Sequence, residues 1–190
     1  MSHWDSAPRI PRLRTNSRFY PGADLRGANL ARAQLHYLDL TGAQLAGTEL
    51  AGADLEGTSL EGADLQGADL SRALLRETRL AGADLRGANL ERASLRDARL
   101  RNANLDGANL RGAVLRAHLS GATLRGANLC GADLLTADVG GADFTGAVYD
   151  GSTVWPGFFF SPKRRGCVRA PTEVVPTSTG AGRGDEPAPA

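Results

Sequence analysis

A hydrophobic residue returns every five positions through most of this chain. Leucine occupies every fifth position from Leu25 to Leu115, nineteen times in succession, and the series resumes after one four-residue step. A period of five fits neither the 3.6-residue turn of an α-helix nor the two-residue alternation of a strand, so the repeat itself must define the fold. The remaining centres, which bring the number of repeats to 26, are Leu119, Leu124, Leu129, Leu134, Val139, Phe144 and Tyr149.

Each five-residue unit predicts one short extended side and one corner. The centre residue and the residue two before it share a face by strand alternation, and we expect both to point inward. The second position is Ala in 22 of the 26 units and the corner is Gly in 17, and Gly adopts positive φ without penalty. Four units would close a square coil of about twenty residues, and stacked coils would bury side chains that no single repeat can bury. The units without Ala have Leu38, Thr48, Thr58 and Thr78 there.

The repeats resemble those of pentapeptide-repeat proteins. Strings such as GADLRGANL, GADLEGTSLEGADLQGADL and GANLCGADL match the A(D/N)LxG pattern of that family, and the resemblance covers residues 21–151. It implies an all-β fold, a right-handed quadrilateral parallel β-helix of about 6.5 coils and about 30 Å in length at the usual spacing of paired strands. It implies little about function. Most members have no assigned activity, and a few bacterial ones protect DNA gyrase from inhibitors by imitating the shape and charge of duplex DNA.

The segment after the repeats, residues 152–166, concentrates large aromatic side chains. An open end of a β-helix exposes core and unpaired strand edge, so we predict that this segment is a C-terminal cap. The resemblance implies a second use, because gyrase-protecting members dimerise through a C-terminal element, and these side chains are large enough to be buried against a second copy. Both interpretations remain open. The residues concerned are Trp155, Phe158, Phe159 and Phe160.

Composition changes outside these two regions. Residues 1–20 contain four Arg against one Asp and lack the apolar run of a signal peptide or membrane span, so we expect a flexible basic arm. Residues 167–190 are rich in Pro, Thr, Gly and Ala, and we expect disorder there. The chain is therefore expected to be one repeat domain with a cap, between two flexible ends.

One corner residue is missing between Leu115 and Leu119. A slip of one residue would normally turn inward side chains outward. Because Ala117 and Leu119 restore the pattern at once, the slip must be absorbed at Arg116. Two interpretations remain, a locally distorted corner, since surface turns tolerate small deletions, and a bend in the rod.

The sequence offers no cluster that predicts catalysis or metal binding. His118 and Ser120 are outward neighbours without a placed carboxylate, so a catalytic triad is not expected. Cys130 and Cys167 form no CxxC and have no metal-ligand spacing with His, and two lone cysteines without a signal peptide are typical of a reducing cytoplasm. The single lysine, Lys163, follows the repeats and belongs to no phosphate-binding loop. We predict a cytoplasmic protein that is not an enzyme, with no catalytic, cofactor-binding or metal-binding residues.

Asp or Asn precedes many of the centre residues, a pattern that could suggest a calcium ladder. Calcium sites need several oxygens that converge on one point, and one carboxylate per side does not supply them. Short Asp and Asn side chains accept hydrogen bonds from corner backbone groups, as Asx turns do. We therefore predict a structural role for these residues.

Charge divides the repeats into three zones although the whole chain carries only +1. Residues 21–70 hold two Arg and eight acidic residues, a net −6; residues 71–116 hold ten and five, a net +5; residues 117–151 hold one and four, a net −3. A twenty-residue coil would stack the middle arginines in columns, with like charges about 5 Å apart. They either fan into solvent and pair locally, or form a contact surface for an acidic partner. This Arg belt comprises Arg72, Arg76, Arg79, Arg92, Arg96, Arg99 and Arg116.

Two functional hypotheses follow from these observations. The first is a non-catalytic interaction module, a rigid column whose Arg belt and acidic ends dock on an unidentified protein, with no direct DNA binding. The alternative, which rests on the resemblance, is a DNA mimic that binds DNA gyrase or a related topoisomerase and protects it from quinolone-type inhibitors. A mimic needs a continuous negative surface, and the Arg belt interrupts it.

Overall fold

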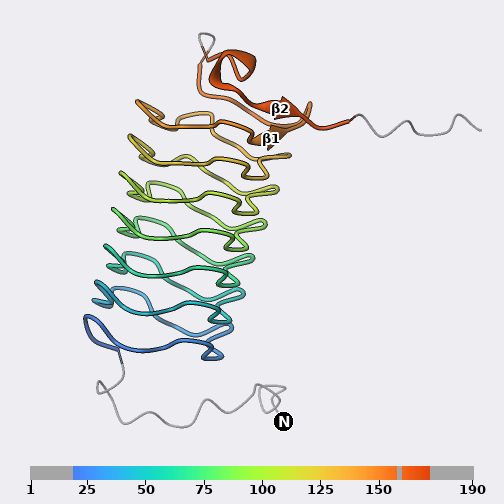
Figure 1. Ribbon diagram of the computed structural model, residues 1–190. Coiled ribbons are helices and arrows are strands. Elements are labelled where there is room, and N and C mark those ends of the chain that lie inside the picture. The colour runs from blue at the N-terminus through green and yellow to red at the C-terminus, as the bar shows by residue number, and fades with distance from the viewer. Residues whose placement is uncertain (1–18, 158–159, 172–190) are drawn as a thin grey trace, which may run out of the picture.

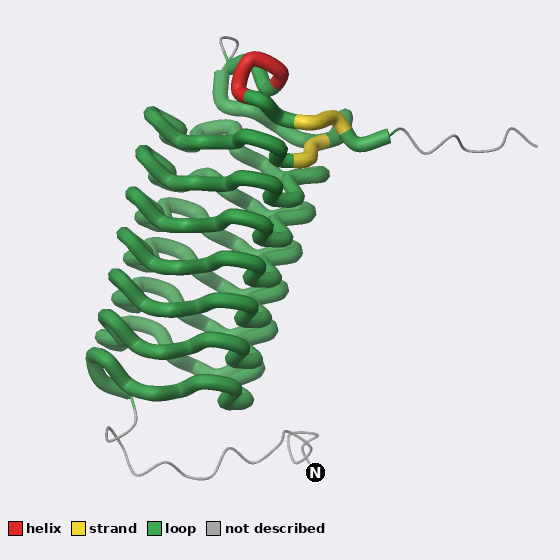
Figure 2. The backbone as a smooth tube through the Cα atoms, viewed as in Figure 1, coloured by secondary structure: helices red, strands yellow, loops and turns green. Residues whose placement is uncertain are grey.

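The computed structural model describes residues 19–157 and 160–171 as a column of stacked coils (Figures 1 and 2). Isolated parallel β-bridges join each coil to the next, and bridge partners are twenty residues apart through most of the column, as for Asp24 and Gln44. Four pentapeptides therefore complete one coil. This confirms the prediction of an all-β solenoid.

The named elements all lie at the C-terminal end of the column. Strand β1 spans Val148–Tyr149 and pairs in parallel with β2, Val168–Arg169, and the 3-10 helix η1 spans Lys163–Arg165 between them. Elsewhere in the described part of the chain, a side of a coil is one bridge residue between two turns. No helix among the described residues is long and apolar enough to cross a membrane.

Backbone hydrogen bonds join the coils in a repeating pattern. The Leu25 N–H donates to the Gln44 carbonyl at 2.8 Å, and the Gln44 N–H donates to the Ala23 carbonyl at 2.9 Å. Corner residues add further bonds, such as that from the Gly22 N–H to the Thr41 carbonyl at 2.8 Å. Turn and ladder bonds thus satisfy backbone groups that would otherwise be buried without partners.

The axis is filled as the repeat predicts. Leucine centres such as Leu60 and alanines such as Ala63 are fully buried. Where Thr replaces the inward Ala, its hydroxyl has a partner: Thr58 Oγ1 donates to the Leu35 carbonyl of the preceding coil at 2.6 Å. The other two inward threonines make the same kind of bond, so the polar atoms do not disrupt the apolar core.

Each of the four sides of the column carries one ladder of outward side chains, and we number the four faces in the order in which the chain first reaches them. The bridges pair the residues of each ladder in successive coils. The first face carries Asp24, Gln44, Asp64, Asp84, Asn104, Thr123 and Asp143, and the second face carries Asn29, Glu49, Asp69, Asn89, Asn109, Asn128 and Val148. The third face carries Gln34, Asp54, Leu74, Ser94, Val114, Asp133 and Val154, and the fourth face carries Asp39, Ser59, Arg79, Arg99, His118 and Asp138.

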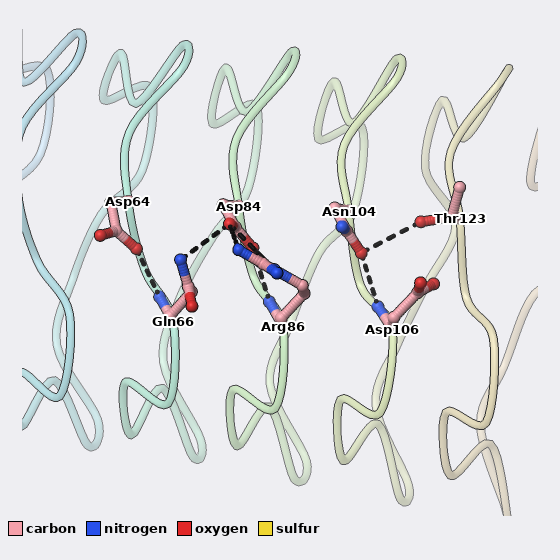
Figure 3. A network of polar contacts seen from close by, with 7 residues as sticks. All are labelled: Asp64, Gln66, Asp84, Arg86, Asn104, Asp106 and Thr123. Carbon is pink, nitrogen blue, oxygen red and sulfur yellow. Dashed lines mark hydrogen bonds and ion pairs between the residues drawn. The ribbon is translucent and has the colours of Figure 1, made fainter.

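Asp and Asn on these ladders support the corner that follows. All fourteen Asp and Asn residues that directly precede a centre accept a hydrogen bond from the backbone N–H two residues later. Figure 3 shows three of these bonds on the first face, including that from the Arg86 N–H to Asp84 at 3.1 Å. The prediction of Asx-type bonds is confirmed.

The missing corner residue at Arg116 is absorbed locally. The interval between bridge partners falls to nineteen, as for Arg99 with His118, while Ala117 and Leu119 stay buried. An extra residue later restores the length, because Asp133 pairs with Val154 at an interval of twenty-one. The slip therefore distorts one corner and leaves the inward pattern unchanged.

Aromatic side chains pack against one another at the C-terminal end of the column. Trp155 stacks on Phe160 with ring centroids 4.7 Å apart, and both rings meet the buried Phe144 edge to face. Arg165 lies over the Phe160 ring at 5.2 Å. Two of the residues predicted to form the cap or a dimer seam, Phe158 and Phe159, lie outside the described residues.

The described chain extends further than the tail boundary expected at Cys167. Cys167 is buried, and β2 continues the ladder because the Val168 N–H donates to the Ala147 carbonyl at 2.8 Å. Residues 167–171 of the segment expected to be disordered lie within the described part of the chain, where the edge of β1 offers backbone partners to β2. The rest of the tail and residues 1–18 of the expected basic arm lie outside the described residues.

Candidate interaction surface

The third face departs from the repeat in three successive coils. Leu74, Ser94 and Val114 occupy the position that Asp or Asn fills on about half of the ladder, and the bridges place them directly beside one another. The fourth face also lacks Asp and Asn in successive coils, but there the residues are polar or charged. Leu74 and Val114 have no acceptor for the corner N–H, and the Ser94 hydroxyl accepts none in this structure, so each coil lacks an Asx-type bond of about 1 kcal/mol. Folding does not require this change, and a surface with another use would explain it.

Arginine columns border this strip on both sides. Arg72 and Arg76 alternate outward with Leu74 in one coil, and Arg92 and Arg96 do so in the next coil. Two arginines of one coil are four residues apart, about 13 Å along an extended chain. The third face therefore presents an apolar and small centre between two basic columns.

Backbone strain is concentrated at the same corners. Seven non-glycine residues in the described part of the chain have positive φ, a conformation that disfavours side chains by about 1 kcal/mol or more each. Six of them border the third face, and the exception is Asn102. The corners between the first and second faces are all Gly, from Gly27 to Gly146. The six strained residues are Arg32, Tyr37, Arg72, Glu77, Arg92 and Asp97.

Four exposed apolar side chains lie on the third face or at its corner with the fourth face, spread along the column. Leu74 is 45% exposed and Val154, further along the third face, is 42% exposed. Tyr37 and Leu135 lie at the corner between the third and fourth faces and are 70% and 48% exposed. These four are among the six large hydrophobic residues that are exposed in the described chain, and Leu74 is the one that lies between the arginine columns.

Several belt arginines lack an ion pair among the described residues. Arg116 is the best-paired member, with its Nη2 atom 2.6 Å from Asp133, and this pairing raises the pKa of Arg116 and lowers that of Asp133. Arg92 lies 3.8 Å from Glu91. Within the described chain, the belt members without an ion pair are Arg72, Arg76, Arg79, Arg96 and Arg99.

Arginines on the first face behave differently. Arg86 Nη2 lies 2.6 Å from Asp84, and Arg125 Nε lies 2.6 Å from Asp143. The Arg86 hydrogen bonds lower the pKa of Asp84, and those of Arg125 contribute to lowering that of Asp143. Figure 3 shows the Asp84 pair within the ladder of the first face. The first face is therefore neutralised locally, whereas the belt around the third face keeps free positive charge.

The fourth face continues the basic surface. Arg79 and Arg99 are bridge partners, as the twenty-residue period predicts, and His118 follows in the next coil. Glu77 and Asp97 form an acidic row between the third face and the basic row of Arg79 and Arg99. A groove of about 400 Å³ lies between the acidic row and the basic row. The alternation of basic and acidic rows differs from the uniformly negative surface that a DNA mimic presents.

The His118 region has a carboxylate that the sequence did not place. Asp138 follows His118 on the fourth face and accepts a hydrogen bond of 2.5 Å from Ser120 Oγ. This hydroxyl faces a carboxylate rather than an imidazole, which is not the arrangement of a catalytic triad. Among the described residues, no group of three or more His, Cys, Asp or Glu is placed to hold a metal ion.

Sequence reasoning found the arginines of this surface but missed its centre. The charge count led to the belt, whereas Leu74, Ser94 and Val114 look unremarkable when each repeat is read alone. The signal was present at a period of twenty, because an outward position that is polar or charged on the other faces of these coils carries Leu74 and Val114 two coils apart.

Comparison with known proteins agrees with the fold. The sequence model of pentapeptide repeats, which spans eight copies, matches residues 20–43, 39–76, 78–116 and 116–148. No curated protein matches the chain.

Solved structures of pentapeptide repeat proteins are similar to this one. The protein alr5209 from Nostoc PCC 7120 has a TM-score of 0.53 and 38% identity, over 54% of this chain and 84% of that chain. A trypsin-treated variant of QnrB1, a plasmid-mediated fluoroquinolone resistance protein, has a TM-score of 0.54 and 25% identity, over 71% of this chain and 75% of that chain. Because the family repeats match most of the column, this chain belongs to the pentapeptide repeat family.

Proposed function

We propose that this protein is a non-catalytic interaction module that docks an acidic protein partner on the third face and its Arg belt. The observation that carries the proposal is the coincidence, in the same coils, of an apolar strip, two arginine columns and strained corners. Interfaces commonly combine an apolar centre with Arg near its edge. A rigid solenoid suits this role, since little conformational entropy is lost on binding.

Finer features of the proposal follow from the family resemblance, the number of repeats and the two lone cysteines. The column is a right-handed coil of about 6.5 turns at the usual strand spacing, and the protein acts in a reducing cytoplasm, where Cys130 and Cys167 remain free thiols. A second copy could also associate end to end through the aromatic cap around Trp155. A cap variant, Trp155→Ala, would then lower the mass measured by light scattering at high protein concentration.

A photocrosslinking experiment tests the docking face. Benzoylphenylalanine placed at Ser94, in the centre of the third face, should crosslink the partner in cells. The same amino acid at Gln66, on the first face, is the matched control and should not. Equal crosslinking from both positions, or crosslinking from Gln66 alone, would reject the third face as the docking surface.

Charge reversal tests the belt in the same assay. Arg76→Glu combined with Arg96→Glu should abolish the crosslink from Ser94, while Arg86→Glu combined with Arg101→Glu, which reverses two arginines elsewhere, should preserve it. Circular dichroism of both variants confirms that the column still folds. Undiminished crosslinking by the belt variant would contradict a role for positive charge.

A second function is favoured by one comparison. The similarity to QnrB1 supports a DNA mimic that binds DNA gyrase and protects it from quinolones. The acidic residues 21–70 suit this role, whereas the Arg belt opposes it. Purified protein added to a gyrase supercoiling assay should inhibit the reaction or relieve quinolone inhibition. Absence of any effect at a large molar excess would reject this function.

A further inference from the structure

We propose that the occupant of the third face is a single α-helix of the partner, lying parallel to the column axis, with an apolar stripe and acidic residues on both flanks. This inference rests on the proposed function and specifies the partner's recognition element. The seat comprises the centre Leu74, Ser94 and Val114, with Arg72 and Arg92 on one border and Arg76, Arg96 and Arg116 on the other.

The dimensions of the seat match a helix. Side chains one coil apart are about 4.8 Å apart, so the centre from Leu74 to Val114 is about 10 Å long. Residues i, i+3 and i+7 of an α-helix rise by about 4.5 and 10.5 Å and lie on one side. A helix is about 10 to 12 Å wide with its side chains, close to the roughly 13 Å between Arg72 and Arg76 along an extended chain. Acidic residues on its two flanks would thus reach the two arginine columns.

An added β-strand does not suit this face. The backbone groups that a strand would need are already bonded within the ladder: the Leu75 N–H donates to the Ser94 carbonyl at 2.8 Å, and the Ser94 N–H donates to the Ala73 carbonyl at 3.0 Å. A strand adds to an open sheet edge, and the side of a solenoid has none. Recognition here must therefore use side chains.

Nucleic acid is a poorer fit than an acidic helix. Leu74 lies between Arg72 and Arg76, where a polyanion would place phosphates or sugars. Glu77 and Asp97 directly follow Arg76 and Arg96 in the chain, and they would repel a nucleic-acid phosphate backbone that extended beyond these arginines. A helix confines its negative charge to two lines and brings an apolar stripe to the centre.

The small seat predicts weak and salt-dependent binding. A contact area of about 10 by 13 Å is well below that of a standard protein interface, and the ion pairs are exposed to solvent. Screening over about 8 Å at physiological ionic strength should weaken binding markedly. Measurements should therefore be made at low salt and at high protein concentration.

A designed peptide tests the inference with the full-length protein. The probe is a fluorescein-labelled helical peptide of about 18 residues, with Leu at i, i+3 and i+7 spacing and Glu on both flanks. A control peptide has Lys in place of every Glu. By fluorescence anisotropy, the Glu peptide should bind about tenfold or more tightly than the Lys peptide, and its affinity should fall as salt is added.

Variants of the protein locate the binding site. Leu74→Asp, and separately Arg72→Glu with Arg96→Glu, should each weaken binding about tenfold or more. The control with Arg86→Glu and Arg101→Glu should bind within about twofold of the wild type. Equal binding of the two peptides, no effect of the third-face variants, or tighter binding of a short DNA duplex would overturn the helix assignment.

The two levels of the proposal fail separately. If the Glu peptide does not bind but Ser94 still crosslinks an acidic partner in cells, the helix assignment is wrong and the interaction module stands. If neither assay gives binding at the third face, both are wrong.

Discussion

The corner at Gly57 allows the strain in this fold to be measured. Gly57 has φ of +65°, and a Cβ built there would lie 2.4 Å from the Cδ1 and Cε1 atoms of the Tyr37 ring in the preceding coil. Gly57→Ala therefore has two consequences. Alanine disfavours the left-handed conformation by about 1 kcal/mol, and the ring must move away from the corner.

The free-energy cost of moving the Tyr37 ring can be estimated from surface area. Tyr37 is 70% exposed, so its ring can swing outward without displacing the core. If ring and corner together re-expose about 40 Å² of apolar surface, the loss is about 1 kcal/mol at about 25 cal/mol per Å². We expect Gly57→Ala to lower the free energy of unfolding by about 2 kcal/mol in total.

A matched glycine and a double-mutant cycle separate the two terms. Gly62 has φ of +63° and open space around its Cβ position, so Gly62→Ala should lower the free energy of unfolding by only about 1 kcal/mol. Gly57→Ala made in a Tyr37→Ala background should also cost about 1 kcal/mol, which leaves about 1 kcal/mol as the coupling between the two sites. The assay is urea unfolding followed by circular dichroism. Equal losses at the two glycines, or a cost at Gly57 that Tyr37→Ala does not relieve, would refute this reasoning.

Three further predictions concern buried and titrating groups. Among the described residues, the Leu35 carbonyl accepts a hydrogen bond only from the Thr58 hydroxyl, whereas the carbonyl bonded by the Thr48 hydroxyl also accepts one from a turn N–H. Thr58→Val should therefore lower the free energy of unfolding by about 1 to 3 kcal/mol, and by more than Thr48→Val does. Equal effects of the two variants in urea unfolding would contradict this. Hydrogen bonds from Thr145 and Arg125 lower the pKa of Asp143 from 3.8 to about 2. Because the pKa in the folded state lies below that in the unfolded state, the ionised carboxylate stabilises the fold fully above the unfolded pKa, and this stabilisation is lost as pH falls from about 4 to about 2. Asp143→Asn should therefore reduce the fall in melting temperature over that pH range, and an unchanged fall would count against this prediction. Burial raises the pKa of the Cys167 thiol to about 11, and it also raises the pKa of the Cys130 thiol. Because the thiolate is the reactive form, iodoacetamide at pH 8 should modify Cys130 of the folded protein faster than the more buried Cys167, as followed by mass spectrometry. Equal rates of modification would be inconsistent with this burial.

The interior of the column was predictable because its physics is local and repeated. Any unit, such as Ala63 with Leu65, contains the two inward side chains and the corner, so the period of five indicates burial without knowledge of distant contacts. Stacking at a period of twenty then follows from closing four sides, and the pairing of Arg79 with Arg99 was predicted in this way. The slip at Arg116 could be read for the same reason, since the inward pattern resumes within the same unit.

The C-terminal end could not be predicted to the same depth. Val168 and Arg169 stand in a stretch rich in Pro, Gly and charged residues, and their pairing with β1 depends on an edge that only the finished column supplies. The contacts of Trp155 with Phe144 and Phe160 likewise join residues outside the regular repeat to its last units. Tertiary context decided these contacts.

Outward residues of the column carry functional information because the fold itself requires only Gly at the corners and Asp or Asn on the ladders. The scaffold is complete with Gly at the corner and Asp or Asn on the ladder, as the corner at Gly67 and the ladder residue Asp64 illustrate. A side chain at a positive-φ corner such as Glu77 or Arg92 disfavours the fold by about 1 kcal/mol or more, and Leu74 gives up a corner hydrogen bond. Departures of this kind at scattered positions would mean little. Since they coincide along the third face and the adjoining fourth face in successive coils, beside arginines that have no ion pair among the described residues, a surface used for binding explains them better than folding does.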